Sequence, residues 1–211
     1  MTNHFRWIAF LLVLACSFAH AGAYEDMRTA ASNGDSVTMK NLLARGFDVD
    51  STDEHGTTLL MDAAGQGQSV SLSTLLDARA KINARNRFGE SALMLAEIRG
   101  HGAIVKQLLA RQAAVNHDGW TALMFAAIKG HVDILQILVN AGAEIDAKSP
   151  NGTTALMLAA KEGNLESVLL LLKYRADVNI RNDAGATALG WAIAGKRDSI
   201  ANVLVRAGAV K

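Results

Sequence analysis

The residues of this chain with the greatest capacity for chemistry are its histidines. Four of them follow residue 23, at His55, His101, His117 and His131. His117 precedes Asp118, and a histidine with a carboxylate partner can act as a general base. Adjacency in the sequence does not establish that geometry, and no nucleophile stands beside the pair. We therefore expect no catalytic site, no metal site and no cofactor.

Four methionines recur at one position of a repeated pattern, where a row of thioethers could bind a soft metal ion. They are Met61, Met94, Met124 and Met157. Residues at one position of a stacked array much more often fill its core, because the methionine side chain is flexible and polarizable. We interpret the row as core packing. Gly190 takes the same position in the last copy and ends the row.

These residues lie within a stretch of sequence that occurs five times. The copies begin at Gly56, Gly89, Gly119, Gly152 and Gly185, so three of the four spacings are 33 residues and the other is 30. A period of this size, with two short apolar patterns in each copy, predicts an all-α repeat fold. We expect a solenoid of helix-turn-helix units joined by hairpin loops, in which each unit buries its apolar faces against its neighbours.

The period divides the chain after residue 23 into six units. Unit 1 is partial, because its sequence matches only the later part of a copy. The units span residues 24–52, 53–85, 86–116, 117–148, 149–181 and 182–211. The interval from Val115 to Gly119 is three residues shorter than its counterpart from Ile82 to Gly89. We expect the loop between units 3 and 4 to lack much of its projecting finger; the sequence leaves open whether this makes a binding notch or is a harmless trim.

Unit 4 shows the repeated pattern most completely. It contains Gly119, Thr121, Leu123, Ala126-Ala127, Gly130-His131, Ile134-Leu135, Leu138-Val139 and Gly142-Ala143. This pattern resembles the ankyrin repeat, and the resemblance extends over residues 24–211. Together with the amino-terminal segment described below, it is similar to ankyrin-repeat proteins of a secreted bacterial type. The resemblance implies that unit 1 is a partial N-terminal repeat and unit 6 a C-terminal repeat.

Two sets of residues carry local predictions. A hydroxyl stands where it can cap the first helix of each complete unit, by accepting a hydrogen bond from an amide that has no partner within the helix. These residues are Thr58, Ser91, Thr121, Thr154 and Thr187. After the second helix, ankyrin repeats usually carry a glycine with positive φ, but this chain has Arg79, Gln112 and Arg175 there. We expect somewhat reduced local stability at these three positions.

Residues 1–23 have the features of a secretory signal peptide. Arg6 is the only Lys, Arg, Asp or Glu in this segment, and an apolar run extends from Ile8 to Ala15. Small residues follow, and cleavage sites of the small-x-small type end at Ala21 and Ala23. The apolar run is far shorter than the roughly 20 residues that a membrane-spanning helix needs. We expect export with removal of this segment.

Cys16 leaves a second route open. The sequence Val13-Leu14-Ala15-Cys16 resembles the lipobox of bacterial lipoproteins, in which the cysteine is lipidated. Leu14 is a less usual residue in that motif, and the two cleavage sites downstream compete with it. The predicted location is therefore periplasmic or secreted, with a lipid-anchored protein of the bacterial envelope as the alternative. Without lipidation at Cys16 we expect no membrane contact.

The charge balance argues against nucleic acid as a ligand. Without residues 1–21, which include one basic and no acidic residue, the chain holds 20 Lys and Arg against 20 Asp and Glu. No basic stripe with interleaved aromatic residues is present. Because neutralisation of phosphates supplies most non-specific affinity for nucleic acid, we expect none to bind. The expected partner is another protein.

The resemblance implies that loop tips and the exposed sides of first helices line a concave groove for that partner. Matching positions give the partner-binding candidates His55, Arg87, Phe88, Trp120, Phe125, Ile128, Lys129 and Trp191. Aromatic residues with nearby cations suit an interface hot spot, and Phe88, Trp120, Phe125 and Ile128 are the strongest candidates. The alternative, for Leu95, Phe125, Leu158 and Trp191, is that these residues merely pack against one another.

The sequence thus predicts a non-catalytic protein–protein interaction module or scaffold in the bacterial cell envelope. A first alternative is a dedicated inhibitor or accessory factor of one envelope enzyme, which predicts one tight partner whose activity changes on binding. A further alternative is an enzyme whose site is unrecognised, which predicts turnover by the purified protein alone.

Overall fold

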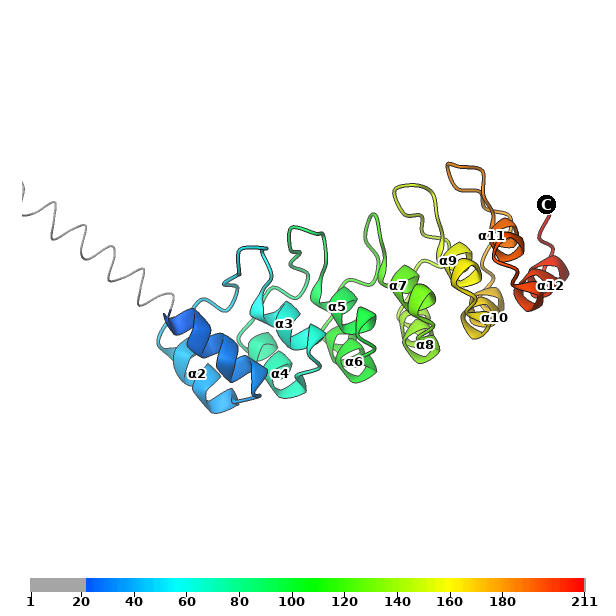
Figure 1. Ribbon diagram of the computed structural model, residues 1–211. Coiled ribbons are helices and arrows are strands. Elements are labelled where there is room, and N and C mark those ends of the chain that lie inside the picture. The colour runs from blue at the N-terminus through cyan, green and yellow to red at the C-terminus, as the bar shows by residue number, and fades with distance from the viewer. Residues whose placement is uncertain (1–21, 211) are drawn as a thin grey trace, which may run out of the picture.

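The computed structural model describes residues 22–210, which form a row of stacked helix pairs (Figure 1). A first helix covers residues 22–32. The helices that follow are α2 Ser36–Ala44, α3 Leu59–Gly65, α4 Ser69–Asp77, α5 Ala92–Ile98, α6 Gly102–Ala110, α7 Ala122–Lys129, α8 Val132–Asn140, α9 Ala155–Glu162, α10 Leu165–Lys173, α11 Ala188–Ala194 and α12 Asp198–Arg206. Within the described residues, extended pairing is limited to one isolated bridge between Thr52 and Thr58. The predicted all-α solenoid is confirmed.

Each predicted unit contains one pair of these helices, and the connecting loops project to one side of the row (Figure 1). Unit 1 also holds a pair, made of the helix over residues 22–32 and α2. That first helix begins inside the segment predicted as a signal peptide, so Ala23 lies within a helix. The predicted cleavage site at Ala21 and the lipidation site at Cys16 lie outside the described residues.

The first helices of units 2 to 6 begin at the predicted hydroxyl residues. In each unit the hydroxyl oxygen accepts a hydrogen bond from the amide three residues later, at 3.0 to 3.4 Å. Such a cap contributes about 1 kcal/mol to helix stability. Because these helices have only seven or eight residues, the caps matter for where each one starts. The predicted capping role is confirmed.

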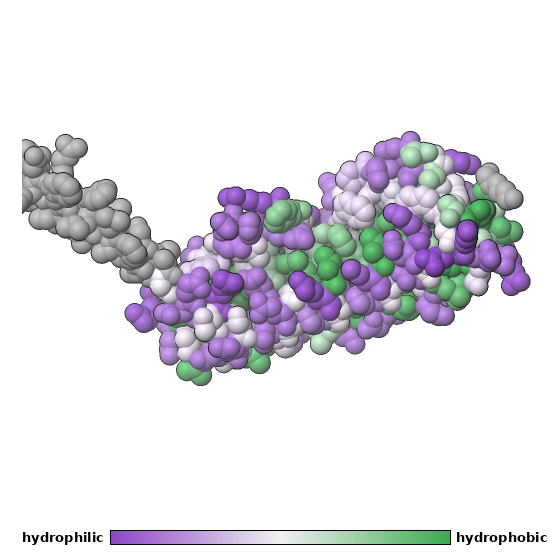
Figure 2. Space-filling model, in the orientation of Figure 1, coloured by the Kyte–Doolittle hydropathy of each residue, from purple (hydrophilic) through white to green (hydrophobic). Residues whose placement is uncertain are grey.

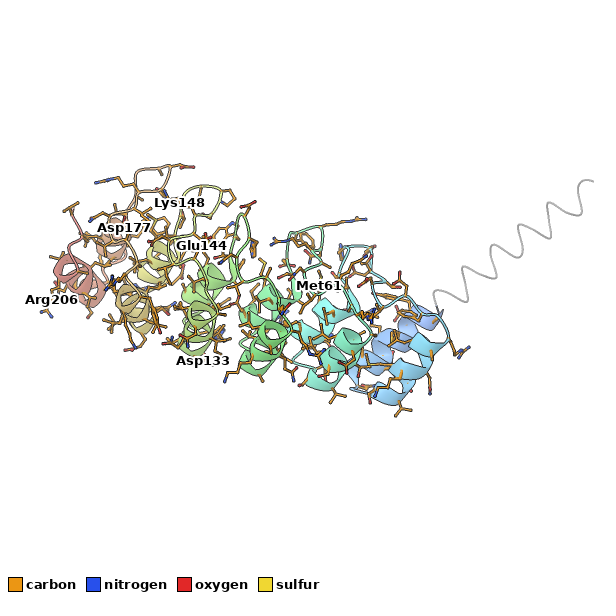
Figure 3. The ribbon with its side chains drawn as sticks, turned by 180° about the vertical axis from the view of Figure 1, so that it is seen from behind. Met61, Asp133, Glu144, Lys148, Asp177 and Arg206 are labelled. Carbon is orange, nitrogen blue, oxygen red and sulfur yellow. The ribbon has the colours of Figure 1, made fainter. Side chains whose placement is uncertain are left out.

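The core runs along the whole row, between first and second helices and between neighbouring units. The alanines of α3, α5, α7 and α9 are buried, which lets neighbouring helices approach closely. The four methionines of the repeated position are also buried, as core packing requires. Figure 3 shows Met61 within the row and Asp133 and Arg206 at its outside. Gly190, at the methionine position of unit 6, is exposed, and unit 6 is the last unit that the structure describes.

The backbone turns left-handed where the sequence predicts it. Arg79, Gln112 and Arg175 have φ of 66°, 64° and 64°. Lys196 is a further case, with φ of 54° at the position where Gly130 and Gly163 end the first helices of units 4 and 5. A side chain in this conformation costs backbone energy that glycine avoids. No helix within residues 22–210 combines the length and apolar character needed to cross a bilayer.

Candidate partner-binding surface

Neighbouring loops are joined through their backbones at two places. The Arg87 amide donates to the His55 carbonyl at 2.9 Å, between the loops that enter units 2 and 3. The Asp183 amide donates to the Asn151 carbonyl at 3.1 Å, between the loops that enter units 5 and 6. Among the described residues, the loop that enters unit 4 has no such bond at its tip. The row of loop tips is therefore linked as two pairs, with the shortened loop between them.

The shortened loop differs from the sequence prediction. It rises between α6 and α7 as a narrow loop on the same side as its neighbours, so the shortening reduces its width and does not remove its projection (Figure 1). Its bonds to the following loop lie at its base, where the Asn116 side chain accepts from the Glu144 amide at 2.8 Å and donates to the Gly142 carbonyl at 2.9 Å. The prediction that this loop lacks much of its projecting part was wrong.

His117 does not form a catalytic pair with Asp118. The His117 Nδ1 atom lies 3.1 Å from the backbone carbonyl oxygen of Asp118, and its Nε2 atom is buried without a hydrogen-bond partner. A general base would need its ring held by the carboxylate, with the other nitrogen facing a substrate. The arrangement instead fixes the conformation of the shortened loop.

Two pairs of aromatic rings lie near this loop, one at the two loop tips that precede it and one where it enters α7. The rings of His55 and Phe88, at adjacent loop tips, have centroids 5.9 Å apart, and Phe88 is 71% exposed. The rings of Trp120 and Phe125 have centroids 5.7 Å apart, and Trp120 is 39% exposed. Tilted rings at these distances attract one another and hold each other in place. Large apolar area is therefore presented to solvent in a fixed conformation.

Half-buried side chains of the first helices extend this apolar area. We call the whole set the central apolar surface, and it consists of Phe88, Leu95, Ile98, Trp120, Phe125 and Ile128. Figure 2 shows hydrophobic residues gathered on this face over the middle of the row, below the projecting loops. Leu158 is only 5% exposed and belongs to the core, so this position is not available to a partner in unit 5.

The predicted cations and Trp191 occupy different settings. Arg87 and Lys129 are exposed, and neither forms a salt bridge within the described residues. Trp191 is half-buried against the core, and the Lys161 Nζ atom lies 5.4 Å from the centroid of its ring. That cation covers one face of the indole. The structure thus pairs Phe88 with His55 and Trp120 with Phe125, and it leaves Trp191 apart, in unit 6.

The sequence of the array matches a known family over most of its length. The family model of ankyrin repeats in three copies matches residues 70–149 and 141–211. The chain belongs to the ankyrin-repeat family. A comparison with curated proteins gives no match. Ankyrin repeats are generally protein–protein interaction modules, and the family is typically non-catalytic.

One buried residue of the ankyrin array escaped the sequence analysis. Glu97, in α5, is 0% exposed, and neither carboxyl oxygen has a hydrogen-bond partner. Burial raises the pKa of this carboxyl well above its usual range. The sequence did contain a signal, because units 2, 4 and 5 carry a pair of alanines where unit 3 has Ala96-Glu97. A match of the sequence to the repeat pattern does not by itself reveal an acidic residue at an alanine position.

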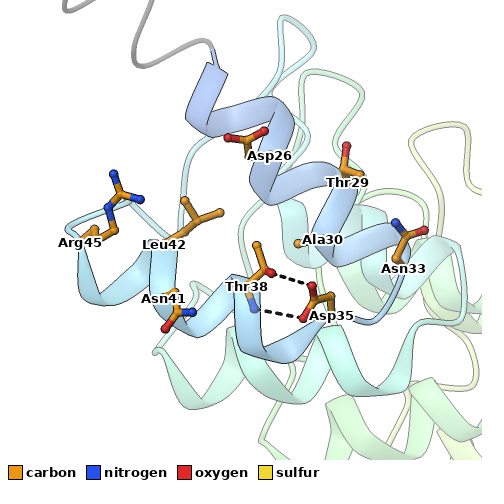
Figure 4. A pocket seen from close by; sticks show the side chains of 9 residues that line it. All are labelled: Asp26, Thr29, Ala30, Asn33, Asp35, Thr38, Asn41, Leu42 and Arg45. Atoms are coloured by element: carbon orange, nitrogen blue, oxygen red, sulfur yellow. Dashed lines mark hydrogen bonds between the residues drawn. The ribbon is translucent and has the colours of Figure 1, made fainter.

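One groove of the ankyrin array lies at its amino-terminal end. A polar groove of about 540 Å³ opens on the outer side of unit 1, between the first helix and α2 (Figure 4). Asp35 lines it, but the Asp35 carboxylate caps α2 by accepting from the Thr38 hydroxyl at 2.6 Å and from the Thr38 amide at 3.1 Å. These bonds lower the pKa of the Asp35 carboxyl. Within residues 22–210, no cluster of three or more His, Cys, Asp or Glu is placed to hold a metal ion.

Proposed function

We propose that this ankyrin array is a non-catalytic binding module or scaffold of the bacterial cell envelope, and that it holds a partner protein on the central apolar surface. The carrying observation is the exposure of Phe88, at the tip of the loop that enters unit 3, and of Trp120, at the end of the shortened loop. Exposed aromatic residues fixed by neighbouring rings lose little conformational freedom when a partner covers them, which favours a hot spot. The Arg87–His55 backbone bond supports the loop that presents Phe88.

The proposed location is the periplasm or the exterior of the cell. It is supported by the leader-like composition of residues 1–23, while Cys16 keeps lipid anchoring as the alternative. Cleavage after Ala21 leaves the helix over residues 22–32 whole, whereas cleavage after Ala23 removes its first two residues. Cleavage after Ala21 suits unit 1 better, because it keeps whole the helix that contributes the buried Met27 to the core.

Affinity capture from envelope extract tests the proposal, with residues 22–211 as bait. A Phe88→Ala, Trp120→Ala double variant serves as the test bait. A Val70→Ala, Leu169→Ala double variant serves as its control, because these exposed apolar residues lie on second helices. We expect one protein to be retained by the unmodified and control baits and lost with the test bait. Equal retention by all three baits would exclude the central apolar surface.

The captured partner also separates a scaffold from a dedicated inhibitor. If the partner is an enzyme, its rate is measured with and without stoichiometric ankyrin array. A change of rate that the Phe88→Ala, Trp120→Ala variant does not produce would assign the inhibitor or accessory role. An unchanged rate would favour the scaffold.

A further inference from the structure

The charges around the central apolar surface follow a pattern that bears on its partner. At the position that ends the first helix, unit 2 carries Gln66, unit 3 carries Arg99, unit 4 carries Lys129 and unit 5 carries Glu162. Cations at this position are thus confined to the two units that hold the central apolar surface. Arg87 adds a third cation at the opposite edge, beside Phe88 at the loop tip.

These three cations form no salt bridge among the described residues. Arg87, Arg99 and Lys129 are all exposed. By contrast, the Lys81 and Arg111 side chains, away from this surface, form salt bridges with Asp50 at 3.5 Å and with Asp77 at 2.8 Å. The charge at both edges of the apolar surface is therefore available to a ligand.

The nearby acidic residues offset only part of this charge. Glu90 is half-buried, and its Oε2 atom accepts a hydrogen bond from Asn86 Nδ2 at 2.7 Å within its own loop. Glu97 is buried, and its raised pKa favours the neutral acid. Asp118 is the one exposed carboxylate at the tip of the shortened loop. In the entering loops and first helices of units 3 and 4, three cations therefore stand against two charged carboxylates, Glu90 and Asp118, and Glu54 lies at the neighbouring loop tip, 3.6 Å from His55 Nε2.

A helix-dipole role accounts for part of the pattern. Lys129 lies in the last turn of α7, and Arg99 is the residue after α5, where cations interact favourably with the helix end. That role does not require Arg87, which lies in a loop, and it does not explain why the same position holds Glu162 at the end of α9. The common property of the three cations is their place around the central apolar surface.

We propose that the central apolar surface binds an acidic segment of the partner protein, with large apolar side chains against Trp120 and Phe88 and carboxylates paired with Arg87, Arg99 and Lys129. This inference rests on the proposed function and specifies the chemistry of the partner. A protein segment fits better than nucleic acid, because the cations border an apolar area and do not form a continuous basic stripe. Complementary charge at the rim sets the choice of partner and speeds association.

Fluorescence anisotropy with designed peptides tests the inference. The probe is a labelled 12-residue peptide that contains Phe, Leu and several Asp and Glu residues. Its counterparts replace the acids by Lys, or the Phe and Leu by Ser. We expect residues 22–211 to bind the first peptide about tenfold more tightly than either counterpart at low salt, with the difference shrinking as salt rises. Equal affinity for the acidic and basic peptides would overturn the inference.

Charge reversal on the protein provides the matched test. Arg99→Glu, Lys129→Glu should weaken binding of the acidic peptide about tenfold and strengthen binding of the basic one. Lys40→Glu, Lys106→Glu makes the same change in net charge on the second helices α2 and α6 and should change neither affinity. If anionic vesicles or an oligonucleotide bind as tightly as the acidic peptide, the surface is a general anion site and the inference fails.

Capture of the natural partner distinguishes a failure of the acidic-segment inference from a failure of the proposed function. Retention of the captured partner by the charge-reversed bait, with loss by the Phe88→Ala, Trp120→Ala bait, would overturn the acidic segment and leave the proposed function standing. Loss with both baits supports both. Retention by both variant baits would exclude the central apolar surface as the binding site.

Discussion

Glu97 and Ala127 occupy the same position of consecutive units and are both fully buried, but Glu97 places a carboxyl group where Ala127 places a methyl group. Both carboxyl oxygens of Glu97 lack a hydrogen-bond partner. An ionised carboxylate without partners is costly in a protein interior, so the group takes up a proton. Unit 3 therefore carries a destabilising feature that its neighbours do not share.

Glu97→Met should raise the free energy of unfolding by about 1 to 3 kcal/mol at pH 8, because it removes an unsatisfied polar group and keeps most of the side-chain volume. Urea unfolding followed by circular dichroism measures the change. Glu166→Met, at an exposed position of α10, is the control and should change the free energy by no more than about 0.5 kcal/mol. A loss of stability in Glu97→Met would mean that the carboxyl has a partner in solution.

The same residue predicts a dependence of stability on pH. Burial raises the folded-state pKa of Glu97, whereas the unfolded chain keeps an ordinary value near 4.5. Below the ordinary value both states are protonated and Glu97 carries no ionisation penalty. As the pH rises above it, the unfolded chain releases the proton first, so folding becomes less favourable until the folded-state pKa is reached. The difference in unfolding free energy between Glu97→Met and the natural chain should therefore grow from pH 4.5 upward, and a constant difference would contradict the burial.

The features that could be predicted from sequence are those that depend on interactions between residues close together in the chain. The cap at Thr58 and the positive φ of Arg79 depend on the residue and its immediate neighbours, so the repeated pattern specifies them. Burial depends on the following unit as well. Leu158 and Phe125 share one position, yet Leu158 is buried and Phe125 is half-buried. The pattern of a single unit contains no information on the side chains that cover it.

Ile193 shows which way the Glu97 position faces. It stands at that position in unit 6, the last unit that the structure describes, and it is 51% exposed. Glu97 therefore lies in the interface between units 3 and 4, the interface that the shortened loop spans. His131 also belongs to this interface, with its ring against Gly100. At the equivalent position of unit 5, Asn164 donates to two carbonyl groups of unit 4, whereas within residues 22–210 the His131 ring makes no such bond to unit 3.

The interface between units 3 and 4 should be the weakest of the array, and His131→Asn should strengthen it. The new amide would reach the carbonyl groups of Glu97 and Ile98, as Asn164 reaches those of Ala127 and Ile128 at 2.8 Å. We expect a gain of about 0.5 to 1.5 kcal/mol in the free energy of unfolding. Hydrogen exchange should show slower opening of α5 and α7. The reciprocal change Asn164→Ala should lower stability, and faster exchange in His131→Asn would count against this account.

Leu138→Ala tests the core of unit 4. Leu138 is fully buried in α8, so the change removes apolar contacts and leaves a cavity. We expect a loss of about 2 to 5 kcal/mol in the free energy of unfolding. Leu169→Ala, at an exposed position of α10, is the control and should have little effect. A thermal midpoint unmoved by Leu138→Ala would contradict the packing of the second helices.

Trp120→Ala and Phe88→Ala should separate binding from stability. Each removes aromatic area that is exposed in the free chain, so each should weaken partner binding by more than about 1 kcal/mol. The thermal midpoint should change little, because neither residue fills the core. Calorimetric titration with the captured partner measures the loss of affinity, and thermal unfolding measures the change in stability.

Trp120→Ala also removes the ring that lies 5.7 Å from Phe125, so we expect it to weaken binding more than Phe88→Ala does. Equal losses of stability and affinity would place both residues in the core and would leave the array without an aromatic hot spot.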